Sequence, residues 1–281
     1  MTLKVEDLFS VRGKVALVTG GATGIGRMIA DGLVQNGAKV YIASRKLEEC
    51  QATAAELSQS GECVALRVDL GDEKSLKDLA AEIATREPKL HILVNNAGAG
   101  WAARIEDYPE AGWDKVMALN VKAPFFLTKA LLPQLRAAAT AGDPARIVNI
   151  GSVAGIGATL SNNFVYSASK AAIHQLSRSL GHYLARDNIT VNAIAPGPFP
   201  SRMMGAMMDD YVDKVPLARG GSPEDAAGTA IYLCSRAGAF TTGVVLTLDG
   251  GKVMQGDAVR PAKKVSLAPV DSQATLKSPS H

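Results

Sequence analysis

The chain has 281 residues, of which 47% are hydrophobic and 20% charged, and its formal net charge is +3. Such a composition indicates a soluble globular protein that is long enough to bury one large core, so we expect a single domain. The basic residues are scattered, which argues against a nucleic-acid-binding surface, and no segment approaches the ~18 consecutive apolar residues of a membrane span.

Short apolar runs and segments of helical spacing alternate along the chain. Buried strands that alternate with helices predict a parallel sheet covered on both faces, and right-handed crossovers favour a doubly wound arrangement. Ligands of such sheets bind at the carboxyl ends of the strands. The predicted strands are residues 14–20, 39–44, 62–68, 91–96, 146–152, 189–195 and 244–251, and the predicted helices are residues 24–36, 47–59, 73–86, 113–139, a helix around residue 166, and 223–235.

Two segments fall outside this alternation. Residues 256–281 are polar, contain prolines and show no sustained period, so we expect a disordered tail after a domain of residues 1–255. Residues 139–145, ATAGDPA, are small and turn-rich, which predicts a surface loop between a helix and a strand.

The first predicted strand continues directly into the sequence TGGATGIG. In this setting Gly20 permits a tight turn, Gly24 lets the backbone approach a pyrophosphate, and Gly26 allows the helix to pack closely on the strand. The helix amino terminus then offers N–H donors to phosphate groups. Glycines in a loop often mark only a turn, but glycines between a strand and a helix predict a dinucleotide site.

Tyr166 and Lys170 are four residues apart on a predicted helix, so their side chains share one face. An ammonium group beside a phenol favours the phenolate, so we expect a tyrosine pKa below its usual value of ~10 and proton exchange near neutral pH. Ser152, at the end of the preceding strand, is placed to hydrogen-bond the same substrate oxygen. The pair is also a frequent accident in amphipathic helices, so its interpretation depends on the other motifs.

The end of the second strand, IASRK, indicates which dinucleotide is bound. Sites for NAD usually place Asp or Glu ~20 residues beyond the glycines to bind the ribose 2′-OH, whereas NADP sites offer Arg to the 2′-phosphate. Ser44 stands where the acid would be, and Arg45 and Lys46 follow it, which predicts NADP(H) as the cofactor. Arg45 and Lys46 would also suit a solvated loop.

Several motifs together resemble the single-domain branch of the short-chain dehydrogenase/reductase family, across nearly all of residues 10–254. The resemblance implies an α/β, doubly wound Rossmann-type parallel sheet in a single domain, with Tyr166 as general acid/base and Ser152 orienting the carbonyl or alcohol. It also implies that Lys170 lowers the tyrosine pKa and holds the nicotinamide ribose, and that Asn120 anchors a water that links Lys170 to solvent. The motifs are TGGATGIG, NNAG at 95–98, Asn120, Ser152, YSASK at 166–170 and APG at 195–197.

The same resemblance assigns the cofactor-binding residues. Residues 96–98 would lie against the adenine-side ribose and the central sheet, and Asp69, beside Leu70, would contact the adenine. Thr23 occupies a position that is basic in many NADPH-preferring members of the family, so a moderate preference is expected. The full set is Gly20, Thr23, Gly24, Ile25, Gly26, Ser44, Arg45, Lys46, Asp69, Leu70, Asn96, Ala97, Gly98, Tyr166, Lys170, and, near the nicotinamide, Pro196 and Gly197.

A narrower resemblance concerns the substrate. The segments NNAGAGW, GWDKVMALNV, NIGSVAGI, HQLSR and APGPFPSRM are similar to the β-ketoacyl reductases of bacterial rhamnolipid synthesis and their relatives, which act with NADPH on 3-oxoacyl thioesters. This implies an NADPH-dependent reductase that turns an apolar ketone, such as a 3-oxoacyl compound, into a secondary alcohol. Two alternatives stay open: an NAD(P)-dependent dehydrogenase of another secondary alcohol, and a non-catalytic dinucleotide-binding regulator.

The substrate region is less informative. Residues 198–212 place Met203, Met204, Met207, Met208 and Tyr211 on one apolar helical face. This face either packs on the core or on a neighbouring subunit, or forms a flexible lid over an apolar substrate. Candidates to complete a pocket are Trp101, Leu160 and Phe164, each of which also suits ordinary packing.

The three cysteines lack metal-ligand spacing and indicate a reducing compartment, and the acidic residues Glu6 and Asp7 argue against a secretory signal. We therefore expect a cytoplasmic protein. The four histidines show no metal-ligand pairing, so we expect no metal, and we interpret His174 and His182 as structural. The family resemblance also implies a homodimer or homotetramer, in which helices at 113–139 and 164–185 pair between subunits.

Overall fold

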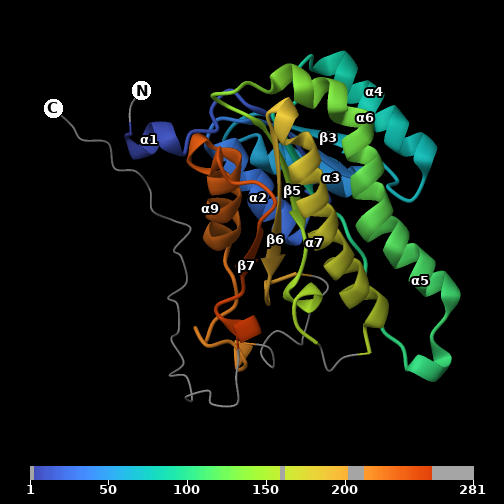
Figure 1. Cartoon of the computed structure of the whole chain (residues 1–281). Helices are drawn as coiled ribbons and strands as arrows, with labels where there is room; N and C mark the ends of the chain where they lie inside the picture. Colours follow the sequence, from blue (N-terminus) through green and yellow to red (C-terminus); the bar gives the residue numbers. More distant parts are fainter. Residues whose placement is uncertain (1–2, 159–161, 202–211, 255–281) are drawn as a thin grey trace.

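A seven-stranded parallel sheet with the strand order β3-β2-β1-β4-β5-β6-β7 forms the centre of the protein (Figure 1). The computed structural model describes residues 3–158, 162–201 and 212–254. From β1 the chain adds strands toward one edge, then returns to place β4 on the other side of β1, which confirms the doubly wound prediction. The strands are β1 (Val15–Thr19), β2 (Lys39–Ser44), β3 (Cys63–Arg67), β4 (Ile92–Asn95), β5 (Ala145–Ile150), β6 (Ile189–Pro196) and β7 (Val245–Leu248).

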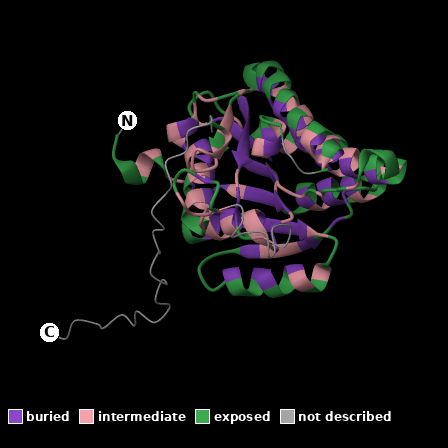
Figure 2. Ribbon diagram, turned by 90° about the horizontal axis from the view of Figure 1, so that it is seen from below, coloured by how far each residue is buried: buried purple, intermediate pink, exposed green. Residues whose placement is uncertain are grey.

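Helices cover both faces of this sheet, and the five inner strands between them are almost wholly buried (Figure 2). The core on one face is built with α2 (Gly24–Gln35), α3 (Leu47–Leu57) and α9 (Pro223–Cys234). The core on the other face is built with α4 (Glu73–Arg86), α6 (Ala123–Ala138) and α7 (Phe164–Leu184). None of the helices in the described ranges combines the length and hydropathy that a membrane crossing requires.

The predicted helix 113–139 differs from the structure in one respect. It begins at Glu110 as α5 (Glu110–Met117), passes through a π-helical turn (Ala118–Lys122) and continues as α6. A π turn inserts one residue without ending the helix, so the apolar pattern on either side still has helical spacing. The short α1 (Val5–Leu8), with no buried residue, was not predicted because four residues carry no readable period.

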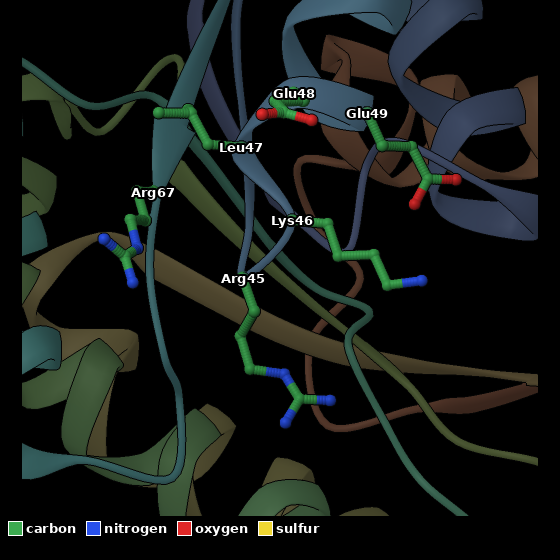
Figure 3. A pocket seen from close by; sticks show the side chains of 6 residues that line it. All are labelled: Arg45, Lys46, Leu47, Glu48, Glu49 and Arg67. Carbon is green, nitrogen blue, oxygen red and sulfur yellow. The ribbon is translucent and has the colours of Figure 1, made fainter.

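The carboxyl edge of the sheet contains a cavity of about 640 Å³ beyond the ends of β2 and β3. Figure 3 shows its lining, which comes from the end of β3, from the loop between β2 and α3, and from the first turn of α3. The lining residues are Arg45, Lys46, Leu47, Glu48, Glu49 and Arg67. This edge is where a doubly wound sheet binds its ligand.

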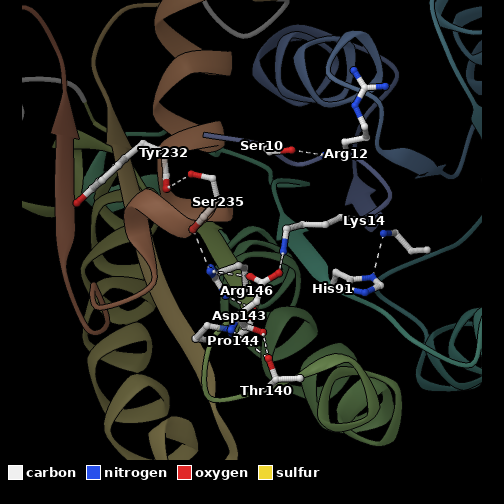
Figure 4. Close-up of polar contacts among 11 residues, drawn as sticks. Ser10, Arg12, Lys14, His91, Thr140, Asp143, Pro144, Arg146, Tyr232 and Ser235 are labelled. Carbon is white, nitrogen blue, oxygen red and sulfur yellow. Dashed lines mark hydrogen bonds and ion pairs between the residues drawn. The ribbon is translucent and has the colours of Figure 1, made fainter. Parts of the chain in front are cut away.

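The amino edge of the sheet contains a buried ion cluster (Figure 4). The side chains of Lys14 and Arg146 are 8% and 1% exposed, and both form ion pairs with Asp143. Arg146 also donates to the carbonyl of Ser235 at 2.9 Å, which ties β5 to the end of α9. The segment 139–145, predicted to be a surface loop, therefore supplies the carboxylate between two buried cations.

Candidate active site

The loop between β1 and α2 has the backbone form that the glycine pattern predicts. Gly20 and Gly24 have φ angles of 64° and 54°, in the left-handed region that glycine adopts most easily. Thr23 precedes the helix in an extended conformation, and its side chain does not cap the first turn, which contains no acidic residue. The first N–H groups of α2 thus have no cap from Thr23, and groups of this kind bind anions.

Asn96 fixes this loop against the end of β4. Its Nδ2 donates to the carbonyls of Thr19 at 3.0 Å and Gly20 at 3.1 Å. A Cβ on Gly26 would lie 2.3 Å from that same nitrogen, so only glycine fits where α2 starts. The side chain of Asn96, together with this glycine, sets the distance between the loop, the helix and the sheet.

The three residues Ser152, Tyr166 and Lys170 meet at the carboxyl end of β5. Ser152 follows this strand, and its side chain hydrogen-bonds that of Tyr166 in the first turn of α7. Lys170 is one turn further along α7, with its Nζ 5.6 Å from the centroid of the Tyr166 ring. The same Nζ donates to the carbonyl of Ile150 at 2.7 Å. The structure thus brings together the side chains that the sequence predicted to share a site.

The pKa of Tyr166 differs from the sequence prediction. Burial raises the pKa of Tyr166 above its usual value of 10.0, and the hydrogen bond from Ser152 opposes this only in part. Burial also lowers the pKa of Lys170 to about 8, which reduces the charge that was expected to favour the phenolate. The prediction of a tyrosine pKa below its usual value considered only the charge of Lys170, and this net direction is wrong because loss of solvent dominates.

Asn120, in the π-helical turn, joins the segment after β4 to the helix that carries Tyr166. Its Oδ1 accepts from the Ala99 N–H at 2.9 Å, and its Nδ2 donates to the Ala99 carbonyl and to Ser169 Oγ, both at 2.9 Å. Ser169 Oγ in turn donates to the carbonyl of Tyr166 at 2.7 Å. A Cβ on Gly98 would lie 3.1 Å from Asn120 Oδ1, so this neighbour must be small.

His174, interpreted from sequence as structural, contacts the backbone of Ser152. Its Nε2 accepts from the N–H of Ser152 at 3.4 Å, and it also hydrogen-bonds the backbone of Gly155. Burial, followed by the charge of Lys170, lowers the pKa of His174 to about 4, so the ring stays neutral at ordinary pH. Periodicity could not reveal this contact, which requires the turn after β5.

Gly151 provides a test of this packing, because a Cβ there would lie 2.0 Å from His174 Nε2. We expect Gly151→Ala to destabilise the protein by about 1–3 kcal/mol, as overpacked core sites do. A double variant that adds His174→Ala should lose less than the sum of the single changes, because the smaller side chain makes room for the methyl group. Thermal unfolding followed by circular dichroism measures both effects.

Gly142→Ala is the matched control, since a Cβ there meets nothing within 4 Å. It should change the free energy of unfolding by less than about 0.5 kcal/mol. Equal destabilisation by Gly142→Ala and Gly151→Ala would contradict the proposed clash.

The remaining cofactor candidates are spread along the carboxyl edge. Ser44 is half-buried, whereas Arg45 and Lys46 are exposed at the cavity shown in Figure 3. Asp69 is exposed and its carboxylate accepts from the Gly71 N–H at 3.0 Å, while Leu70 lies in the core at 8% exposure.

The other cofactor candidates lie nearer the centre of the sheet. Ile25 is half-buried against the core, and the N–H of Ala97 donates to Thr19 Oγ1. Pro196 and Gly197 lie at the end of β6.

Three aromatic side chains gather at the first turn of α7, the turn that also carries Tyr166. Trp101 and Phe164 are 37% and 44% exposed, and Tyr108, half-buried, packs edge-on against Phe164 at 5.9 Å between ring centroids. Tyr108 Oη also donates to the carbonyl of Trp101 at 2.9 Å. The other pocket candidates, Leu160, Met203, Met204, Met207, Met208 and Tyr211, lie outside the described residues.

Comparisons with known proteins identify the family. The chain matches the family model of short chain dehydrogenases over residues 14–211. It is 49% identical over 253 residues to the rhamnolipids biosynthesis 3-oxoacyl-[acyl-carrier-protein] reductase of Pseudomonas aeruginosa, which covers 88% of this chain and 99% of that protein. It is also 37% identical over 257 residues to the NAD-dependent glycerol dehydrogenase of Listeria innocua, covering 89% and 98%.

The solved structures agree with these relatives. The Pseudomonas aeruginosa RhlG/NADP active-site complex superposes with a TM-score of 0.85 at 47% identity, over 88% of this chain and 98% of that chain. The match to the family model spans strands β1 to β6, the glycine loop and the helix of Tyr166, all of which lie in residues 14–211. The chain belongs to the short-chain dehydrogenase/reductase family.

Proposed function

We propose that this protein is an NADPH-dependent reductase that converts the ketone of a 3-oxoacyl thioester, or a similar apolar β-keto compound, into a secondary alcohol. The observation that carries the proposal is the convergence of Ser152, Tyr166, Lys170 and Asn120 at the carboxyl end of β5. A non-catalytic dinucleotide-binding protein would have no need to hold these four side chains together. The similarity to the 3-oxoacyl reductase of Pseudomonas aeruginosa supports the substrate class.

In this mechanism Tyr166 is the general acid that protonates the oxygen of the substrate ketone. Its raised pKa keeps the phenol protonated at neutral pH, which suits a group that must give up a proton during reduction. Ser152 hydrogen-bonds the phenol and is placed to hold the same substrate oxygen. Lys170 lies beside the ring of Tyr166, and its Nζ is held in place by a hydrogen bond to the carbonyl of Ile150. The reduced nicotinamide supplies the hydride when it is bound.

The residues at the carboxyl edge fit a dinucleotide that carries a 2′-phosphate. The glycine loop presents the uncapped amino terminus of α2, which suits the pyrophosphate. Ser44 carries no charge and so does not repel a phosphate, and Arg45 offers a planar pair of donors beside it. Relatives of this chain include an NAD-dependent enzyme, so it is Ser44 and Arg45 that favour NADPH over NADH.

We expect the protein to use NADPH at least tenfold better than NADH in kcat/KM, equivalent to ~1.4 kcal/mol. The variant Ser44→Asp with Arg45→Leu should reverse this preference, because it adds a carboxylate that repels the 2′-phosphate and removes a donor that binds it. Initial rates with both cofactors measure the ratio. The control Arg12→Leu removes an exposed arginine that precedes β1 at the opposite edge and should leave the ratio unchanged. Equal use of both cofactors by the parent would contradict this assignment of Ser44 and Arg45.

The substrate class is tested by NADPH consumption with 3-oxoacyl thioesters, simple β-ketoesters and cyclic ketones side by side. We expect the highest kcat/KM with 3-oxoacyl thioesters, since Trp101 and Phe164 expose apolar surface at the first turn of α7, which carries Tyr166. A preference for small polar ketones would favour the second candidate, a dehydrogenase of another secondary alcohol, which the similarity to glycerol dehydrogenase supports. Silence across the panel with NADPH still bound would favour a regulatory protein.

We also propose that the protein is cytoplasmic and forms a homodimer or homotetramer. Its three cysteines are free and buried, as suits a reducing compartment. Apolar side chains on α5, α6 and α7 are exposed, with Trp113 at 44%, Phe125 at 39% and Tyr183 at 73%. Light scattering on the purified protein tests the assembly, and a monomer at micromolar concentration would reject it.

A further inference from the structure

Arg67, which sequence analysis did not single out, lies beside Ser44 on the neighbouring strand. The register pairs Ser44 with Arg67, and the N–H of Val68 donates to the carbonyl of Ser44 at 3.0 Å. Side chains of paired residues in a parallel sheet project to the same face. Ile42 and Cys63, which belong to the core on the α2 and α3 face, fix which face this is, because Ser44 and Arg67 follow them by an even number of residues.

The side chain of Arg67 consequently lines the cavity at this corner together with Arg45 and Lys46 (Figure 3). β3 is the edge strand of the sheet, so no further strand covers Arg67 on its outer side. Arg45, Lys46 and Arg67 have no ion pair or hydrogen bond to a carboxylate within the part of the chain that the structure describes. All three cations are therefore available to a ligand.

The charges around the cavity show why Arg67 matters. Arg45, Lys46 and Arg67 are opposed by two carboxylates, Glu48 and Glu49, in the first turn of α3. With Arg67 the lining has one excess positive charge, and without it the lining is neutral. A phosphate carries nearly two negative charges, so it is attracted to the positive lining much more strongly than to the neutral one.

The glycine loop cannot supply this charge. Thr23 is uncharged, and Arg27, in the first turn of α2, pairs with Glu56 at 2.5 Å. The cations near the ribose 2′ position thus come from the ends of β2 and β3 rather than from the loop between β1 and α2. Arg67 compensates for the missing basic residue of that loop.

We infer that Arg67 binds the 2′-phosphate of NADPH together with Arg45, and that it is a determinant of the preference for NADPH. The inference rests on the proposed function in one respect, the identity of the cofactor. A guanidinium group suits the role because it presents two parallel donors to a phosphate, and Ser44, being small, leaves room for the phosphate between the two arginines.

The experiment uses two ligands that differ only in the 2′-phosphate, adenosine 2′,5′-bisphosphate and 5′-AMP. Their dissociation constants are measured by calorimetry on the full chain, so the result does not depend on turnover. We expect Arg67→Gln to weaken the bisphosphate about tenfold, equivalent to ~1.4 kcal/mol, and to leave 5′-AMP within about twofold. The loss should shrink at high salt, since the corner is exposed and its charges are screened.

Two further variants make the result specific. Arg67→Lys keeps the charge but loses the planar pair of donors, so it should lose part of the affinity that Arg67→Gln loses. Arg12→Gln removes the same charge at the amino edge of the sheet and should leave the dissociation constants of both ligands unchanged. Circular dichroism spectra that match the parent would show that each variant is folded.

The outcomes separate this inference from the proposed function. If the parent binds both ligands equally, the NADPH assignment fails and the role of Arg67 fails with it. If the parent prefers the bisphosphate and Arg67→Gln keeps the full preference, only the role of Arg67 is overturned. An equal loss for both ligands would also overturn it, because Arg67 would then support the adenosine site and not the phosphate.

Discussion

Replacement of Tyr166 by Phe is expected to lower kcat at least ~10²-fold with little change in NADPH affinity. The substitution removes the hydroxyl that hydrogen-bonds Ser152 and keeps the ring, which packs close to Gly100 and Lys170. Because the hydroxyl is the only part deleted, cofactor binding and folding should persist. Steady-state rates and NADPH fluorescence titration measure the two quantities separately.

The matched control is Tyr183→Phe on the same helix, where the side chain is 73% exposed. This variant should retain the activity of the parent. Activity of Tyr166→Phe within tenfold of the parent would reject Tyr166 as the general acid, whatever the control shows.

Replacement of Asp143 by Asn is expected to destabilise the protein by about 2–4 kcal/mol, although Asp143 lies far from the active site. The carboxylate neutralises two cations, Lys14 and Arg146, whose side chains are 8% and 1% exposed. An unpaired buried cation is costly, and the value stays below that of a fully buried pair because Asp143 itself is 40% exposed. The melting temperature should fall by roughly 2–4 °C for each kcal/mol.

Asp187→Asn is the control for this prediction, because Asp187 pairs with Arg136, whose side chain is 50% exposed. An exposed pair contributes about 0–1 kcal/mol, so this variant should melt close to the parent. Similar melting temperatures for Asp143→Asn and Asp187→Asn would show that the buried cluster does not stabilise the fold.

The fold followed from local patterns in the sequence. The predicted strand 39–44 and helix 73–86 coincide with β2 and α4, because a buried apolar run and an amphipathic period are visible in a single segment. The Tyr166 and Lys170 pair was also predictable, since one helical turn separates the two residues along the chain. Ser152 was identified from its place at the end of a predicted strand, and in the structure β5 ends at Ile150, two residues before Ser152.

What sequence analysis missed depends on neighbours that are distant along the chain. Arg67 and Ser44 become adjacent only through strand register, and Asp143 becomes a partner of Lys14 only when β1 and β5 are brought into one sheet. The predicted direction of the Tyr166 pKa was wrong for a related reason, because the extent of burial is a property of the whole fold. Local spacing identified the candidate reacting groups, and tertiary packing determined their environment.

The π-helical turn at Ala118–Lys122 also affects the backbone of Asn120. In a regular α-helix the carbonyl of Asn120 would accept from the N–H four residues later, but that residue is Pro124, which has no N–H. The Ala123 N–H reaches back to the carbonyl of Ala118 instead, as the wider turn requires. The carbonyl of Asn120 therefore lacks the donor that a regular α-helix would give it. A one-residue deletion here would rotate everything after it by roughly 100° about the helix axis, so this helix tolerates substitution far better than a change in length.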